Sequence, residues 1–192
     1  MTLTQMALGR MTLARQVALV LGGTVLLAVA SQVSVPFYPV PLTMQTLAIM
    51  LIGFAYGARL GTITILAWLG QALLGAPVLA NFNNGAAFVG PTAGFLIGFI
   101  GLAWLTGFAA DRGITSPLKL AVVALVASAL IYVPGLAWPL GVAQMLGIEA
   151  GWAGLSFGQV MAGFALPFWF GDAVKACLAA LIVSGAIKAI RA

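Results

Sequence analysis

Long apolar runs follow one another along almost the whole of this 192-residue chain, and only short segments with Pro, Gly or a charged residue interrupt them. Charged residues make up 6% of the chain and mean hydropathy is +1.17, whereas about 25% of the residues in a soluble domain are charged. Since a transmembrane helix needs about 20 apolar residues, this length allows about six spans with short loops. We therefore expect one all-α integral membrane domain over residues 1–192.

Six transmembrane helices are predicted from the positions of the interruptions. They cover residues 13–31, 44–58, 60–75, 93–110, 117–134 and 168–189. The fifth connection, 135–167, is the longest, and its apolar stretch 157–166 is expected to lie at the membrane interface or to dip into it. Arg10 and Arg15 before the first run also resemble the start of a cleavable signal peptide, but the membrane segments that follow favour a retained first helix.

The basic residues predict the orientation of these helices. If the six spans alternate in direction, seven Lys and Arg residues fall on one side of the membrane: Arg10, Arg15, Arg59, Arg112, Lys119, Lys188 and Arg191. The three opposite connections contain no Lys or Arg and carry only Glu149. Because cytoplasmic loops are enriched in Lys and Arg, both termini are predicted to be cytoplasmic, in the cell (inner or cytoplasmic) membrane.

Asp172 and Lys175 are the charged residues that no loop or membrane edge explains. An ionisable group at the centre of a transmembrane helix costs about 2.5–3.5 kcal/mol, so it persists mainly where it is paired, lines a wet cavity or binds a ligand. Three positions apart, the two residues share a helix face, and on the predicted topology they lie about 6–10 Å below the outer end of the last helix. They form either an outward-facing ligand site or a salt bridge that only joins helices.

Uncharged polar groups are frequent in the first and third connections, on the same outward side. They are Ser34, Tyr38, Thr43, Gln45 and Thr46 in and after the first connection, and Asn81, Asn83, Asn84 and Thr92 in the third. We expect Tyr38, Thr43, Gln45, Asn81, Asn83, Asn84 and Thr92 to complete a binding site above the charged pair. The alternative for each Asn is a structural one, because Asn side chains commonly cap turns.

Missing motifs exclude several functions. The chain has no Gly-x-x-x-x-Gly-Lys-[Ser/Thr] loop, no histidine and one cysteine, Cys177, so nucleotide hydrolysis, a metal site and an internal disulfide are not expected. The scattered basic residues form no stripe that could follow nucleic acid. The chain is predicted not to be an enzyme; the Ser184 and Lys188 spacing supports an intramembrane enzyme only weakly. A small proton-coupled transporter or channel acting as an oligomer, with Asp172 as a relay, stays open.

Small residues recur every four positions in the first span, at Ala14, Ala18 and Gly22. Such a face lets two helices approach closely, either within the chain or with a partner. Because the face begins at the cytoplasmic edge of a helix that we expect to be peripheral, it is the better candidate for a partner surface.

Four stretches in order along the chain resemble the BioY family, the biotin-specific S components of energy-coupling-factor (ECF) vitamin transporters. They read Pro39-Val-Pro-Leu-Thr-Met-Gln-Thr46, Gly75-Ala-Pro-Val-Leu-Ala80, Gly90-Pro-Thr-Ala-Gly-Phe-Leu-Ile-Gly-Phe99 and Gly171-Asp-Ala-Val-Lys-Ala-Cys-Leu-Ala-Ala180. The resemblance implies a six-helix subunit that captures biotin from outside, with a transmembrane coupling protein of the EcfT type and two ABC ATPases as partners. It also implies that Ala14 and Ala18 contact the coupling protein. No cofactor is expected, and biotin is the transported ligand.

Biotin has groups that match the predicted site. Lys175 could hold its carboxylate or a carbonyl oxygen, Asp172 could accept its ureido N–H groups, and the loop amides and hydroxyls could complete the polar ring. The resemblance therefore favours a ligand site over a purely structural salt bridge. Which end of biotin meets Lys175 is not decided by the sequence. The chain also reads Asn81-Phe-Asn-Asn-Gly85 where many relatives have a glycine-rich run, so the contacts of this loop are open.

Overall fold

A computed structural model describes residues 2–191 of the chain, and almost all of its regular structure is helical. The first half contains α1 (Leu3–Leu8), α2 (Leu13–Gln32), the two-residue antiparallel strands β1 (Ser34–Val35) and β2 (Leu42–Thr43), α3 (Gln45–Leu73) and the short 3-10 helices η1 (Ala80–Phe82) and η2 (Gly85–Val89). The second half contains α4 (Ala93–Asp111), α5 (Pro117–Leu130), α6 (Tyr132–Ala137), η3 (Trp138–Val142), α7 (Ala143–Met145), α8 (Phe157–Val160), η4 (Met161–Ala165) and α9 (Leu166–Arg191).

Five helical runs within residues 2–191 are long and apolar enough to cross a membrane. They are Leu13–Gln32, Gln45–Leu73, Ala93–Asp111, Pro117–Met145 and Phe157–Arg191. The expectation of an all-α multi-pass membrane protein is therefore supported. Six spans were predicted and five runs are found, because the predicted helices 44–58 and 60–75 form the single run α3.

The α3 run folds back on itself at Gly57. This glycine has φ 84° and ψ 172°, which no residue within a helix adopts. A Cβ atom built on Gly61 would lie 3.2 Å from the Cα atom of Gly53, whereas residues eight apart in a continuous helix are separated by about 12 Å. The Ala58 N–H donates to Asp111 Oδ2 at 2.9 Å, so the end of α4 caps the second arm of this hairpin.

The fifth connection is mostly helical, which corrects two predicted boundaries. The run that begins as α5 continues through α6, η3 and α7 to Met145 instead of ending at residue 134, and the last run begins at Phe157 instead of residue 168. The π-helical turns η3 and η4 keep both runs continuous. Asp172 therefore lies about 22 Å along its helical run, deeper than the predicted 6–10 Å, and the stretch 157–166 is not a separate interfacial helix.

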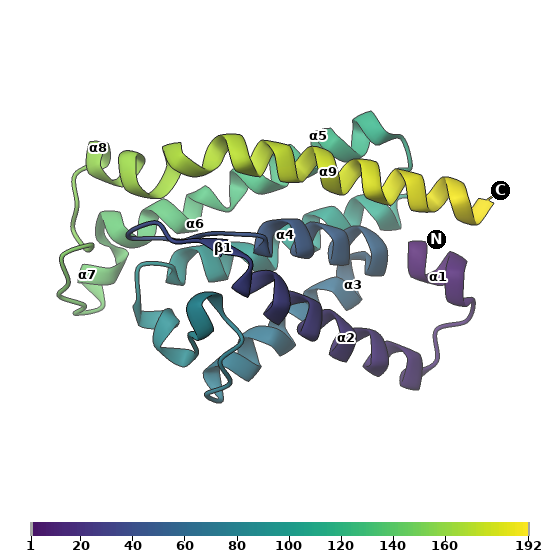
Figure 1. Ribbon diagram of the computed structural model, residues 1–192, viewed down its shortest axis with the longest axis horizontal. Helices are drawn as coiled ribbons and strands as arrows, with labels where there is room; N and C mark the ends of the chain where they lie inside the picture. The colour runs from purple at the N-terminus through teal and green to yellow at the C-terminus, as the bar shows by residue number, and fades with distance from the viewer. Residues whose placement is uncertain (1, 192) are drawn as a thin grey trace.

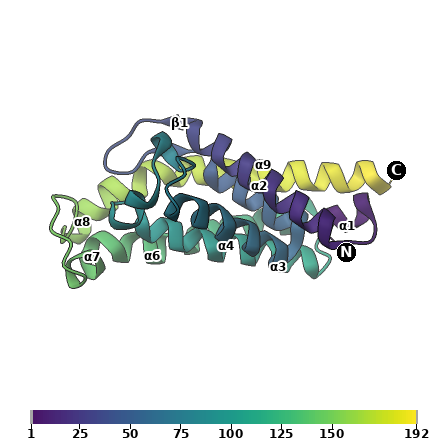
Figure 2. The same ribbon diagram turned by 90° about the horizontal axis from the view of Figure 1, so that it is seen from below.

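Both ends of the chain lie at the same end of the molecule, and α7 and α8 lie at the opposite end (Figure 1). The view turned by 90° shows the same arrangement, with α9 running along most of the length (Figure 2). The short helix α1 was not predicted. The Thr4 hydroxyl donates to the Ala55 carbonyl at 3.0 Å, so α1 lies beside the α3 turn at the end that carries the termini.

Close backbone contacts place α4 in the centre of the bundle. A Cβ atom built on Gly94 would lie 2.2 Å from the Pro134 carbonyl, and one built on Gly107 would lie 2.4 Å from the Ala58 nitrogen. In contrast, α2 is peripheral, and Ala14, Ala18 and Gly22 are all exposed. Apart from Gly22, its two chain neighbours and the nearby backbone of α2, no described heavy atom lies within 4 Å of a Cβ built on Gly22. Internal packing therefore does not explain this small-residue face.

Candidate ligand-binding site

A cavity of about 190 Å³ lies between the segment that precedes α3, the segment 79–92, and helices α3, α4, α6 and α9. Phe95, Leu96, Phe99 and Phe168 form much of its apolar wall. Its polar wall consists of Thr43, Gln45, Thr46, Asn81, Asn83, Thr92, Tyr132, Asp172 and Lys175. The cavity thus combines apolar rings with a small set of converging polar groups, which is typical of small-molecule sites.

Asp172 is the centre of the polar wall and is 6% exposed. Its Oδ1 atom accepts from the Lys175 ammonium at 3.0 Å and from the Thr46 hydroxyl at 3.2 Å. Its Oδ2 atom accepts from the Tyr132 hydroxyl at 2.6 Å. Three helices therefore meet at one carboxylate, and these contacts compensate for its removal from water.

A count of the bonds shows what the charged pair can still offer. A carboxylate has about four lone-pair sites and an ammonium has three N–H donors. Lys175 donates to Asp172 and to Thr46 Oγ1, at 3.3 Å, which leaves one donor. Asp172 receives two bonds at Oδ1 and one at Oδ2, which leaves one acceptor site at Oδ2. The pair is a salt bridge, as one interpretation predicted, and it also lines the cavity with an unused donor and acceptor.

The three loop asparagines differ in their surroundings. Asn81 lines the cavity, and its side chain forms no hydrogen bond with any described residue. Asn83 lines the cavity too, but its Oδ1 accepts from the Asn84 N–H at 2.8 Å. Asn84 does not line the cavity; its Oδ1 accepts from the Ala86 N–H at 3.2 Å and caps η2. The turn-capping alternative therefore describes Asn84.

Gln45 and Thr43 belong to a chain of hydrogen bonds at the rim of the cavity. The Thr43 hydroxyl donates to Gln45 Oε1 at 2.9 Å, and Gln45 Nε2 donates to the Ser31 hydroxyl of α2 at 3.0 Å. Gln45 is 6% exposed. Both residues line the cavity, but Gln45 is also a structural link between α3 and α2.

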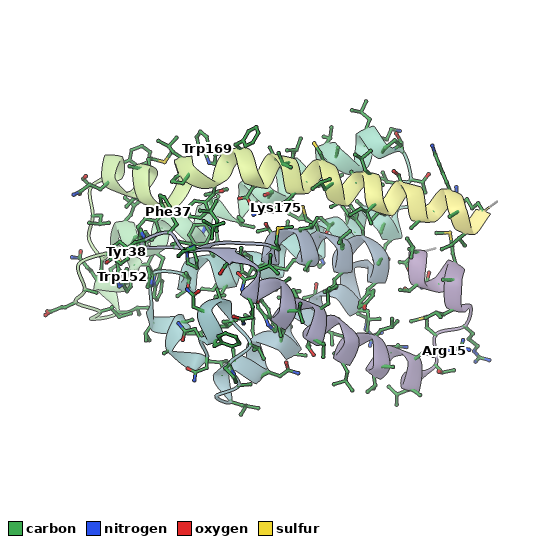
Figure 3. The ribbon with its side chains drawn as sticks, viewed as in Figure 1. Arg15, Phe37, Tyr38, Trp152, Trp169 and Lys175 are labelled. Carbon is green, nitrogen blue, oxygen red and sulfur yellow. The ribbon has the colours of Figure 1, made fainter. Side chains whose placement is uncertain are left out.

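Tyr38 is placed away from the cavity, contrary to the prediction. Its side chain is 79% exposed and does not line the cavity. Figure 3 shows Tyr38 and Trp152 toward the end of the molecule opposite Arg15, with Lys175 about midway between the two ends. The position of a side chain in an exposed loop depends on the backbone conformation of that loop. The sequence does not reveal this conformation, so it could not show that Tyr38 points away from the cavity.

Two of the polar residues that line the cavity, Thr46 and Tyr132, were not among the predicted site residues. Thr46 had been noted only as a polar group near the first connection, and Tyr132 had not been noted at all. A signal for Tyr132 exists in the sequence, since a phenol within an apolar span needs a hydrogen-bond partner. No spacing rule connects it with Asp172, which is 40 positions away in the sequence.

These features define a multi-pass membrane protein with a cavity in which a few polar side chains converge beside aromatic rings. A family model described as the BioY family matches residues 3–192. The chain belongs to the BioY family, which confirms the resemblance seen in the four sequence stretches.

Relatives of known name agree with this assignment. The chain is 32% identical over 166 residues to "Biotin transporter BioY" of Rhizobium etli, which covers 82% of this chain and 83% of that protein. It is 34% identical over 172 residues to "Probable biotin transporter BioY" of Pyrococcus horikoshii, which covers 88% of this chain and 94% of that protein. A crystal structure of the S-component for biotin from an ECF-type ABC transporter matches with a TM-score of 0.71 and 26% identity, over 93% of this chain and 95% of that chain.

Proposed function

We propose that this protein is the biotin-binding S component of an ECF-type vitamin transporter and captures biotin from the extracytoplasmic side. The observation that carries the proposal is the cavity in which Asp172 and Lys175 retain an unused acceptor and donor beside Thr46 and Tyr132. The relatives are named as transporters, which agrees with a protein that binds and moves a ligand and does not act as an enzyme.

The chemistry of biotin fits the two walls of the cavity. Its ureido group has N–H donors and one carbonyl acceptor, and the pair formed by Asp172 and Lys175 offers one acceptor and one donor. Its fused rings and aliphatic chain would lie against Phe95, Phe99 and Phe168. The Asn81 amide, which bonds to no other side chain or backbone group among residues 2–191, is available to a second polar group of the ligand.

We further propose six transmembrane segments with both termini in the cytoplasm of the cell or inner membrane. The reversal of α3 at Gly57 supports six segments, because it divides one of the five apolar runs into two arms. The position of both chain ends at one end of the molecule supports a common side for the termini (Figure 1). With this orientation, the cavity opens toward the outside.

The expected partners are a transmembrane coupling protein of the EcfT type and ABC ATPases. The exposed small-residue face of Ala14, Ala18 and Gly22 on α2 is the proposed contact with the coupling protein. Such a face would let a partner helix approach closely.

The test is binding of biotin to the purified protein in detergent. The wild-type protein should retain biotin at one molecule per site, and desthiobiotin should compete because it keeps the ureido ring. Asp172→Asn and Lys175→Ala should each weaken binding at least tenfold, which is about 1.4 kcal/mol, while the protein stays folded. Lys188→Ala, near the end of the same helix, is the matched control and should bind as the wild type does.

A double variant separates a ligand role from a purely structural salt bridge. Breaking a buried pair leaves one charge without compensation and costs about 3–5 kcal/mol, whereas removing both charges is often tolerated. Asp172→Asn combined with Lys175→Met should therefore fold and still fail to bind biotin. Normal affinity in this double variant would show that the pair is only structural. A folded wild-type protein that does not bind biotin would refute the proposed function.

A further inference from the structure

The last residue of α2, Gln32, holds the loop that carries Asn81. Its Nε2 donates to the Leu79 carbonyl at 2.9 Å, and its Oε1 accepts from the Phe82 N–H at 3.1 Å. One amide side chain therefore bonds to the backbone on both sides of Ala80 and Asn81. A Gln amide is suited to this role because it has a donor and an acceptor at neighbouring atoms.

The loop between these two anchors has an unfavourable backbone conformation. Asn81 has φ 57° and ψ 36°, and the next residue, Phe82, has φ 55°. Residues other than glycine rarely adopt positive φ, and bulky ones do so least. Two such residues in succession persist only where the surrounding structure holds them.

The loop is closed by its own backbone and fixed in place by Gln32. The Leu79 N–H donates to the Asn83 carbonyl at 3.0 Å, and the Asn83 N–H donates to the Ala80 carbonyl at 3.2 Å. These bonds keep the loop compact but join it to no helix. The bonds from Gln32 to Leu79 and Phe82 attach it to α2 and so set the position of Asn81 at the cavity.

We propose that Gln32 is a positioning residue for the ligand site. Gln32 does not line the cavity itself, and it acts by holding Asn81 where that amide can bond to a polar group of the ligand. The proposal rests on the proposed function, since Asn81 is taken as a contact of biotin. It adds a residue outside the cavity that determines affinity.

The test compares two Gln→Met substitutions in the purified protein. Met has nearly the length of Gln but forms neither hydrogen bond, so Gln32→Met removes the attachment without opening a large space. The dissociation constant for biotin should rise about tenfold, as expected for the loss of two ordinary hydrogen bonds, with faster dissociation. Gln71→Met is the matched control, because Gln71 bonds to Thr24 of α2 at 3.3 Å but does not line the cavity; it should bind as the wild type does.

A double-mutant cycle tests whether Gln32 acts through Asn81. Asn81→Ala alone should weaken binding, and Gln32→Met should then change the dissociation constant by less than about twofold in the Asn81→Ala protein. If Gln32→Met does not fold, Gln32→Glu replaces it; this variant keeps the acceptor for Phe82 and puts an oxygen against the Leu79 carbonyl, so binding should again weaken.

Three results would overturn the inference. The first is a normal affinity for biotin in Gln32→Met, and the second is a normal affinity in Asn81→Ala. The third is that Gln32→Met lowers the affinity by the same factor in the wild-type and the Asn81→Ala backgrounds. Each applies to a chain whose wild-type form binds biotin. Failure of the wild type to bind would instead refute the proposed function, so the two failures are distinguishable.

Discussion

Replacing Tyr132 by Phe removes one oxygen atom from the wall of the cavity and leaves the packing of the ring unchanged. The lost hydroxyl donates to Asp172 Oδ2 at 2.6 Å, and the ring packs edge-on against Phe95 with centroids 5.8 Å apart. Phe keeps that edge contact. The substitution therefore tests the hydrogen bond to the carboxylate alone.

The magnitude follows from what the hydroxyl does to Asp172. A hydrogen bond to a charged group contributes about 1.5–3 kcal/mol to stability, and we expect the variant to lose about that much. The bonds from Lys175 and Thr46 still hold Oδ1, but Oδ2 is then unrestrained. Ordering a side chain on binding costs about 0.5–1.5 kcal/mol, so biotin affinity should fall between about twofold and tenfold.

The assay is a calorimetric titration of purified protein with biotin, together with a thermal unfolding curve for each variant. Tyr56→Phe is the matched control, since the Tyr56 hydroxyl forms no hydrogen bond within residues 2–191 and does not line the ligand cavity. In an Asp172→Asn background, Tyr132→Phe should add little, because both changes act on the same bond. Unchanged or tighter binding in Tyr132→Phe would refute the reasoning.

Three further predictions concern other parts of the molecule. Replacing Ala14 and Ala18 by Leu should leave biotin binding unchanged and reduce uptake by cells that contain the coupling module; normal uptake would reject the partner face. Asp111→Ala removes the cap of the α3 hairpin and should lower the free energy of unfolding by about 1 kcal/mol, and equal unfolding curves would show that the cap does not matter. Ser128 is 3% exposed and its hydroxyl bonds to no described residue, so Ser128→Ala should leave stability unchanged or raise it; a clear loss would indicate a partner for this hydroxyl.

The charged pair was the part of the site that the sequence predicted best. Two ionisable residues three positions apart in an apolar span share a helix face by geometry alone, and in the structure they form the 3.0 Å ion pair that lines the cavity. Their depth was predicted less well, because it depended on where the helix begins. The sequence predicted a long connection over 135–167 with one interfacial stretch at 157–166, whereas extensions of the two neighbouring helical runs, each with a π-helical turn, fill most of it.

The hairpin in α3 shows a second feature that local sequence patterns predict only in part. Arg59 indicated a membrane edge, and a reversal does occur close to it, but the residue that makes the turn is Gly57, through its positive φ. The turn also depends on Asp111, which is 53 residues from its partner Ala58. Local patterns reveal that a run must be interrupted; they do not reveal which distant side chain stabilises the interruption.

The same limit applies to the loop amides. Asn81 and Asn84 are the same residue type and lie in the same loop of the sequence. In the structure, however, Asn81 lines the cavity and Asn84 caps a 3-10 helix. Asn81 lies between the two backbone groups that bond to Gln32, about 50 positions earlier, whereas Asn84 bonds to the backbone of its own turn. Sequence could therefore name the loop as a source of ligand contacts but could not choose among its members.

The two proposals together make α2 a connection between the partner and the ligand. At its C-terminal end, Ser31 accepts from Gln45 of α3, and the adjacent Gln32 bonds to the loop that carries Asn81, so one helix end supports two walls of the cavity. At its other end, the exposed small-residue face that begins at Ala14 is the proposed contact for the coupling protein. A helix moves largely as one unit. A partner that displaces α2 along or about its axis would therefore lengthen the hydrogen bonds of Ser31 and of Gln32 at the same time. Loss of both supports would lower the affinity for biotin when the partner acts, which is the change that release to the cytoplasm requires.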